Sequence, residues 1–343
     1  MTTDFFTDLQ QRNLIHQVSS PDLAGVLRAN RLVGYIGFDP TADSLHVGSL
    51  MHLVNLRRFQ QAGHRPIAVV GGGTGLIGDP SGKENERSLL TRAQIEQNLA
   101  GIRRQVAHFL DFSNDAAVLV NNVDWLGQLN LVEFLRDIGK HFSVNQMVMR
   151  DSVRVRLETR EQGLSYTEFS YMLLQSYDFL ALYDRYGCTL QMGGSDQWGN
   201  ILSGADLIRR LRGVEAYGLT TPLLTKPDGS KFGKSEEGNV WLDPRRTSPY
   251  RFYQFWLNAE DQGAVQYLKT FTLLPLAEIT EAERAQAAAP QERTTQRLLA
   301  EEITRLVHGP EALARAQRAT EILFNPDADF HQHTYAHRYG THA

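Results

Sequence analysis

The chain has 343 residues, of which 42% are hydrophobic and 22% are charged, and its formal net charge at pH 7 is −4. This length and composition are typical of a globular protein of about two domains and exclude a disordered chain. The net negative charge argues against wholesale non-specific binding of nucleic acid, but it is compatible with a local basic face.

The N-terminus and the cysteine content indicate the compartment. Residues 1–17 lack the basic and apolar regions of an export signal, and no stretch approaches the ~18 apolar residues that span a membrane. Cys188 is the single cysteine, so an internal disulfide is excluded, and we interpret it as a small buried hydrophobic residue. The sequence therefore predicts a cytoplasmic protein without a membrane segment.

Residues up to about 30 are predicted to be a helical lead-in, and the first strand and helix of the main domain follow. Val33–Phe38 is a short apolar run that an Asp-Pro pair ends, and an amphipathic helix begins near Leu45. His46 and Gly48 fall in the first turn of this helix, where free backbone N–H groups and the helix dipole attract an anion. A histidine in this position is more often a surface or capping residue, so a phosphate site needs support from other motifs.

A glycine-rich loop follows the second strand, which is predicted at residues 66–70. The loop contains a literal G-x-G-x-x-G at Gly73, Gly75 and Gly78, the spacing of a dinucleotide site. However, it follows the second strand unit, lacks an acidic residue at a strand end about 20 residues later, and runs into Asp79 and a proline rather than a helix. We therefore disfavour a dehydrogenase and interpret the stretch as a ligand-binding loop.

Strands and helices continue to alternate up to about residue 220. Strands are predicted at 118–125 and 188–194, and helices at 91–110, 129–140, 145–156, 167–183 and 201–212. This alternation favours an α/β fold with a doubly wound parallel sheet, a Rossmann-like arrangement.

The remaining chain has a different pattern. We predict the α/β domain at residues 1–220, a glycine- and lysine-rich loop and linker at 221–247, a smaller all-helical domain at 248–324 and a loose tail at 325–343. A His-x-His pair in the tail has the spacing of metal ligands, but an unstructured tail is the favoured interpretation.

The predicted helix 167–183 has polar groups on one face. Tyr171, Gln175 and Asp178 are spaced four and three residues apart, so a phenol, an amide and a carboxylate share one stripe. Such a stripe can bind a small polar ligand, although an exposed face of a structural helix is the alternative. In a doubly wound sheet, Tyr35 reaches the same crevice.

Lys231 and Lys234 lie three residues apart in a glycine-flanked loop, KFGKS at residues 231–235. A lysine in such a loop is a point charge for phosphate, and a solvated loop is the ordinary alternative.

Four motifs occur in one order along the chain: HVGS at 46–49, GDPSGK at 78–83, GGSDQWGN at 193–200 and KFGKS at 231–235. Together they resemble the signatures of class I aminoacyl-tRNA synthetases, and the residues of the tyrosine-bearing helix resemble the bacterial tyrosyl-tRNA synthetases. The likeness runs from about residue 13 to residue 324. Ser49 replaces the second histidine of the family's first motif, and the chain apparently lacks the small RNA-binding module that follows the helical, anticodon-side domain.

The resemblance implies sites for L-tyrosine and ATP. For tyrosine, it implies that the phenol meets Tyr35 and Asp178, the ammonium group meets Asp79, Tyr171 and Gln175, and the carboxylate side meets Gln197 and Lys83. For ATP, it implies that the phosphates meet His46, Ser49, Lys231 and Lys234, with Ser235 in the same loop motif, and that adenosine meets Gly37, Asp39, Gly48, Gly194 and Asp196. Thr41 is implied to lie close to the reacting phosphate, and Mg²⁺ to accompany ATP.

The resemblance also implies the reaction and the partners. Tyrosine is activated to tyrosyl-adenylate with release of pyrophosphate, and the tyrosyl group then passes to the 3′-terminal ribose of tRNA(Tyr) in a homodimeric enzyme. Two arginine groups are predicted to bind the tRNA, with solvated helix faces as the alternative: Arg150, Arg154 and Arg156, and Arg209, Arg210 and Arg212. A non-charging relative and an enzyme for tryptophan remain alternatives, and Asp178 facing Tyr35 favours a phenol.

Overall fold

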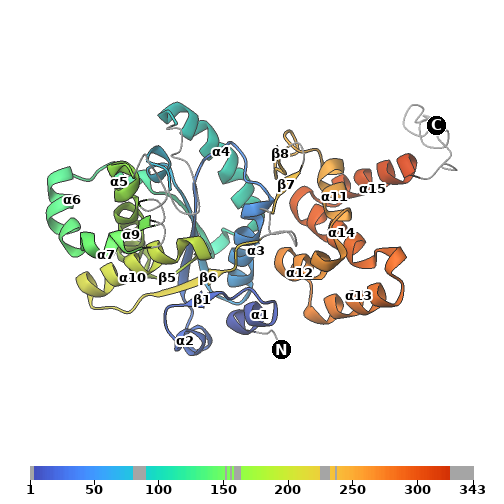
Figure 1. Cartoon of the computed structure of the whole chain (residues 1–343), viewed down its shortest axis with the longest axis horizontal. Helices are drawn as coiled ribbons and strands as arrows, with labels where there is room; N and C mark the ends of the chain where they lie inside the picture. The colour runs from blue at the N-terminus through green and yellow to red at the C-terminus, as the bar shows by residue number, and fades with distance from the viewer. Residues whose placement is uncertain are drawn as a thin grey trace. The chain divides into compact units, whose positions relative to one another are not determined.

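The computed structural model in Figure 1 describes residues 4–79, 90–150, 153–154, 157, 164–224, 232–235 and 238–324. The chain divides into two compact units. The first is Met1–Gly233 together with Lys269–Leu273, and the second is Lys234–Leu268 together with Leu274–Ala343. Within the described residues, the helices are all too short or too polar to cross a bilayer.

The first unit is built on a six-stranded sheet with the order β1-β6-β5-β2-β3-β4. Its strands are β1 (Gln17–Val18), β2 (Val33–Phe38), β3 (Arg65–Val70), β4 (Val118–Asn121), β5 (Cys188–Gly194) and β6 (Tyr217–Thr221). All neighbouring strands are parallel except β1, which pairs antiparallel with β6. The predicted doubly wound α/β sheet is confirmed, while β1 and β6 were not predicted.

Strand β2 is the point where the strand order reverses, because it pairs with β3 on one side and with β5 on the other. In open α/β sheets, ligands bind outside the carboxyl ends of the strands at this position. The topology thus predicts where the site lies before any side chain is considered.

Helices of the first unit connect these strands. They are α1 (Phe5–Gln11), α2 (Leu23–Ala29), α3 (Val47–Gln61), α4 (Arg92–Phe109), α5 (Val123–Leu126), α6 (Leu131–Asp137), α7 (Val144–Val148), α9 (Tyr166–Tyr186) and α10 (Trp198–Arg212). Helix α4 begins with a capping box between Thr91 and Gln94, and α9 ends at Gly187, whose left-handed backbone closes the last turn.

The predicted strand at 118–125 is wrong in its second half, since β4 ends at Asn121 and α5 begins at Val123. The reason is a pair of side-chain bonds: Asn121 accepts from the N–H of Gly72 and Asn122 accepts from the N–H of Gly73. These bonds tie the end of β4 to the glycine loop, so the chain turns instead of continuing the strand.

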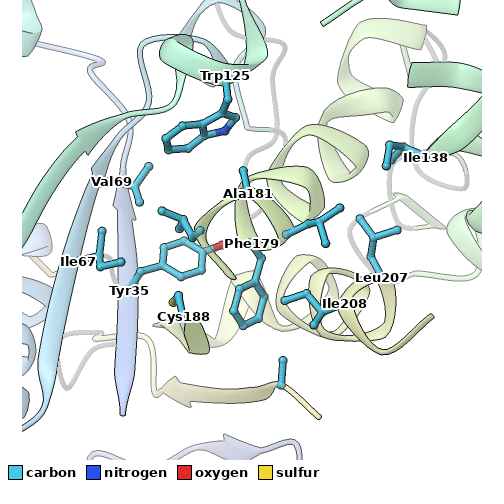
Figure 2. Packing of buried hydrophobic residues seen from close by; sticks show 13 residues of the cluster. Tyr35, Ile67, Val69, Trp125, Ile138, Phe179, Ala181, Cys188, Leu207 and Ile208 are labelled. Atoms are coloured by element: carbon cyan, nitrogen blue, oxygen red, sulfur yellow. The ribbon is translucent and has the colours of Figure 1, made fainter. Parts of the chain in front are cut away.

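The core of the first unit packs α9 and α10 against the sheet. Figure 2 shows the Tyr35 ring of β2 packed edge-on against Phe179 of α9, with ring centroids 5.3 Å apart. Cys188 is fully buried in this cluster, as predicted, and burial raises the pKa of its thiol. The Tyr35 ring is therefore part of the packed core of the first unit.

The second unit contains a small hairpin and helices. Its elements are β7 (Lys234–Ser235), β8 (Gly238–Asn239), α11 (Pro249–Leu257), α12 (Asp261–Phe271), α13 (Leu276–Ala288), α14 (Thr294–His308) and α15 (Pro310–Phe324). The last residues of α12 and the two that follow belong to the first unit. There, the buried Arg58 donates to the carbonyls of Lys269 and Thr272.

Candidate active site

A cleft opens at the carboxyl ends of β2 and β5. It gathers side chains and backbone from β2, α3, the glycine loop, α9 and the turn after β5. The sequence-predicted residues that line it are Tyr35, Gly37, Asp39, Thr41, His46, Ser49, Asp79, Tyr171, Gln175, Asp178, Gly194, Asp196 and Gln197. Residues as far apart as 35 and 197 therefore form one site.

Asp178 lies at the inner end of the cleft and is only 4% exposed. Its Oδ2 accepts a hydrogen bond from Asn122 Nδ2 at 2.9 Å, and its Oδ1 accepts one from Trp125 Nε1 at 2.6 Å. Burial raises the pKa of this carboxyl from 3.8 to about 7, against the two hydrogen bonds, which lower it. Asn122 and Trp125 were missed as functional residues; the polar stretch after the β4 strand was the available signal.

The Tyr35 hydroxyl lies in the same region and is completely buried. It has no hydrogen-bond partner among the described residues. Burial raises the pKa of Tyr35 well above 10, and the nearby Asp178 raises it further. A buried hydroxyl without a partner is costly, so a ligand or an ordered water that bonds to it would relieve this cost.

The middle of the cleft is a polar network around the predicted face of α9. Gln197 Nε2 donates to Asp79 Oδ2 at 2.8 Å, Gln175 Nε2 donates to Gln197 Oε1 at 3.2 Å, and the Tyr171 hydroxyl donates to Asp39 Oδ2 at 3.3 Å. Burial raises the pKa of Tyr171 well above 10, and the carboxylates of Asp39, Asp79 and Asp178 add to the effect. The concentration of carboxylates favours a cationic group here.

At the outer end, the N-terminus of α3 faces the cleft. His46 is its N-cap, and its Nδ1 accepts from the N–H of Gly48 at 3.0 Å. Because Nδ1 accepts, a neutral ring carries its proton on Nε2. A Cβ on Gly48 would lie 2.7 Å from the His46 ring, so only glycine permits this cap.

The KFGKS loop approaches the same helix end through its glycine. Gly233 has a φ of +91°, and a Cβ built on it would lie 2.9 Å from Val47 Cγ2 and 3.3 Å from the backbone nitrogen of Gly48. The two motifs, almost 190 residues apart in the chain, are thus in direct contact. Lys83 and Lys231 lie outside the described residues, as do the side chains of Lys234 and Ser235.

Besides Asn122, three polar lining residues were not singled out from the sequence: His52, Thr74 and Gln191. Thr74 donates to Asp39 Oδ1 at 3.2 Å and accepts from Asn122 at 2.9 Å. His52 is half-buried, with a fully buried Nδ1 that has no partner within the described part of the chain. Burial lowers the pKa of His52, with Asp196 opposing it, so the ring is neutral. His46, Ser49 and His52 follow one another at intervals of three residues, which was a usable helical signal.

The predicted arginine groups are partly neutralised. Arg209 and Arg210 both pair with Asp206, and Arg212 pairs with Asp184 at 2.7 Å. Arg150 donates to the hydroxyl of Ser203. Arg156 lies outside the described residues. The exposed end of α10 keeps an excess of positive charge, because its two pairs with Asp206 share one carboxylate.

Comparisons with known proteins agree with this geometry. Residues 28–325 match the family model of the class I tRNA synthetases (W and Y). The tyrosine–tRNA ligase of Roseiflexus castenholzii is 56% identical over 324 residues, which cover 94% of this chain and 76% of the relative. That of Geobacillus stearothermophilus is 55% identical over 328 residues, which cover 94% and 78%.

Among solved structures, the C-terminally truncated mitochondrial tyrosyl-tRNA synthetase of Aspergillus nidulans superposes with a TM-score of 0.84. It is 31% identical, and the match covers 94% of this chain and 95% of that one. A tryptophanyl-tRNA synthetase from Plasmodium falciparum shares the fold, with a TM-score of 0.64 and 13% identity, and the match covers 91% of this chain and 84% of that one. The chain therefore belongs to the class I tRNA synthetases for tryptophan and tyrosine, and within them to the tyrosine–tRNA ligases.

Proposed function

We propose that the cleft activates L-tyrosine with ATP, forming tyrosyl-adenylate and pyrophosphate, and that the tyrosyl group then passes to the 3′-terminal ribose of tRNA(Tyr). One observation carries this proposal: a single cleft contains, in order, a buried hydroxyl and carboxyl, a carboxylate-rich middle and a helix N-terminus. These three regions match the phenol and the ammonium group of tyrosine and the phosphates of ATP.

At the inner end, the phenol hydroxyl of tyrosine would bond to Asp178 and Tyr35. Phenylalanine would leave both buried groups unpaired, and a site built to bond a hydroxyl rejects an analogue that lacks it. Tyrosyl-tRNA synthetases are themselves the established example of this rule. A tryptophan side chain would bring an indole N–H, which donates only, so it cannot accept a hydrogen bond from Tyr35.

In the middle of the cleft, the ammonium group would lie among Asp79, Tyr171 and Gln175. Binding there competes with Gln197 for the Asp79 carboxylate. The amide N–H groups of Gln197 are then released toward the substrate carboxylate, which agrees with its role by resemblance, alongside Lys83. This exchange of hydrogen-bond partners would orient both the ammonium group and the carboxylate of the bound tyrosine.

At the outer end, a carboxylate oxygen of tyrosine attacks the α-phosphorus of ATP, and the bond from this phosphorus to pyrophosphate breaks. The attacking carboxylate needs no general base, so catalysis rests on positioning and on neutralising the charge of the leaving group. His46 and Thr41 line the cleft at the N-terminus of α3, and His46 Nε2–H, the N–H groups of α3 and Thr41 would do this work. We assign the same task to Lys231, Lys234 and Ser235 by resemblance, since the loop glycine lies against α3.

Mg²⁺ would arrive with ATP. No group of three or more His, Cys, Asp or Glu side chains in the described residues is arranged to hold a metal by itself. A cleft with few carboxylates arranged together suits an ion that is held mainly by phosphate oxygens and water, because nucleotide-bound Mg²⁺ uses only one or two protein carboxylates. Asp39 and Asp196 line the cleft and would face it. When bound, the ion supplies positive charge against the phosphates.

We further propose that the protein is a homodimer in the cytoplasm. Apolar side chains that are at least 46% exposed gather on and beside α6 and α7: Leu131, Val132, Leu135, Val144 and Met149. An apolar surface of this kind is typical of an interface, and a second copy is the partner that the family likeness supports.

The decisive experiment measures tyrosine-dependent exchange between pyrophosphate and ATP, and then charging of tRNA(Tyr), on one preparation at fixed salt. We expect exchange with tyrosine and none with tryptophan or phenylalanine at equal concentration. Exchange driven by tryptophan would overturn the substrate assignment. Tight binding of tyrosine without any exchange would identify a non-charging relative instead.

A further inference from the structure

Phe232, the second residue of the KFGKS motif, stacks on a residue from a distant part of the chain. Its ring lies 5.4 Å from that of Phe271, centroid to centroid, at an interplanar angle of 24°. Phe271 is the last residue of α12 and is completely buried, whereas Phe232 is half-buried. Neither residue lines the cleft, so the pair would act on a ligand there only through other residues.

The segment that carries Phe271 is bonded to α3. Arg58, near the C-terminal end of α3, donates from Nη2 to the carbonyl of Lys269 at 2.8 Å and to that of Thr272 at 2.6 Å. Arg12 donates to the same Lys269 carbonyl at 3.2 Å. Both guanidinium groups are buried, and hydrogen bonds from a charged donor are stronger than neutral ones. Phe271 therefore lies between two backbone carbonyls that are bonded to α3.

The residue after Phe232 contacts the other end of the same helix. A Cβ built on Gly233 would lie 3.3 Å from the backbone nitrogen of Gly48, in the first turn of α3. The motif thus meets α3 in two ways: Gly233 touches its N-terminus directly, and Phe232 reaches Arg58 through the segment of Phe271. These two contacts hold neighbouring residues of the motif beside the helix whose N-terminus faces the cleft.

The contacts matter because of the residues beside them in the chain. Lys231 precedes Phe232, and Lys234 follows Gly233. Ordering a backbone costs conformational entropy, and a contact that orders it before a ligand binds lowers that cost at the binding step. The stacked pair would supply this order for the backbone next to both lysines.

We propose that Phe271 is a positioning residue for ATP, which stacks on Phe232 and so holds the KFGKS motif against the N-terminus of α3. This inference rests on the proposed formation of tyrosyl-adenylate. Ordinary packing of two apolar side chains is the competing explanation, and it predicts no selective effect on ATP. The two explanations therefore differ in which substrate responds when the stack is removed.

Phe271→Leu tests the proposal, because leucine keeps a large apolar side chain and removes the ring. In pyrophosphate exchange, we expect kcat/KM for ATP to fall about three- to tenfold through loss of the aromatic pair, while KM for tyrosine stays within about twofold. The matched control is Phe109→Leu, which removes another buried ring of the first unit outside the cleft and should leave both constants unchanged. Equal losses for ATP and tyrosine in Phe271→Leu, or no loss, would overturn the proposal.

Variants of Phe232 add a second readout. Phe232→Leu should reproduce the loss for ATP, and the double variant with Phe271→Leu should lose clearly less than the product of the single losses, because both changes break one contact. Phe232→Tyr keeps the ring and should retain the kcat/KM of the parent for ATP. Multiplying losses in the double variant would contradict the shared contact.

Limited digestion with trypsin tests the stack without any substrate. We expect cleavage after Lys231 and Lys234 to be about three- to tenfold faster in Phe271→Leu than in the parent and in Phe109→Leu, while cleavage at other sites keeps its rate. A uniform increase at all sites, or no increase, would contradict the proposed role of the stack. Because digestion needs neither ATP nor tyrosine, absence of exchange in the parent would refute only the proposed activity.

Discussion

Replacing Asp178 with asparagine should change the pH dependence of stability in a calculable way. The pKa of the carboxyl is raised from 3.8 to about 7 in the folded state because the group is buried. The folded protein therefore holds this proton more tightly than the unfolded chain does. The contribution of Asp178 to stability is therefore fully present below pH 3.8 and is lost as pH rises through 7.

The magnitude follows from the two pKa values. Between pH 5 and pH 8.5, the free energy of unfolding of the parent should lose about 3 kcal/mol through this one group, by linkage. The asparagine side chain of the variant does not titrate, and all other groups are common to both proteins. Replacing one oxygen acceptor by an amide also removes a hydrogen bond to Asn122 or Trp125, at a constant cost of about 1–2 kcal/mol. As pH rises, the free energy of unfolding of the variant should therefore increase relative to that of the parent.

Urea unfolding followed by tryptophan fluorescence at several pH values from 5 to 8.5 measures this shift. We expect the free-energy difference between variant and parent to change by about 2–3 kcal/mol over the range, whatever its value at pH 5. In the same variant, discrimination of tyrosine from phenylalanine should be lost. A difference that does not vary with pH would refute the assignment of a raised pKa to Asp178, because a constant offset reports only the lost hydrogen bond.

Three further predictions concern other parts of the chain. Lys231→Ala or Lys234→Ala should slow adenylate formation far more than it weakens tyrosine binding, because charge on pyrophosphate grows only in the transition state. Stopped-flow fluorescence with tyrosine alone and then with ATP measures both, and equal losses in tyrosine affinity and in the rate of adenylate formation would contradict this. Arg58→Met should destabilise the first unit by about 3 kcal/mol in chemical unfolding, since Arg58 is a buried donor to the carbonyls of Lys269 and Thr272, and an unchanged midpoint would contradict this. Charge reversal at Arg209 and Arg210 should weaken tRNA binding and flatten its salt dependence while sparing pyrophosphate exchange, so unchanged tRNA affinity would leave them as solvated side chains.

Much of the site was readable from the sequence because its determinants are local. The helix-start pattern around His46 and Gly48 predicted the N-terminus of α3, whose cap the structure shows. The spacing of Tyr171, Gln175 and Asp178 predicted one face of α9, and all three line the cleft. Helical and strand periods are properties of the backbone, so they are visible in any window of sequence.

The tertiary structure alone decided how these local pieces meet. The Asp178 carboxyl receives hydrogen bonds from residues 53 and 56 positions earlier, and these partners, with burial, determine its pKa. The pairing of Tyr35 with Gln191 depends on the register of two strands that are distant in the chain, and the return of Lys269–Leu273 to the first unit has no local signal. Burial and long-range hydrogen bonds arise only when the sheet order brings distant segments together, and no pattern within a single segment encodes that order.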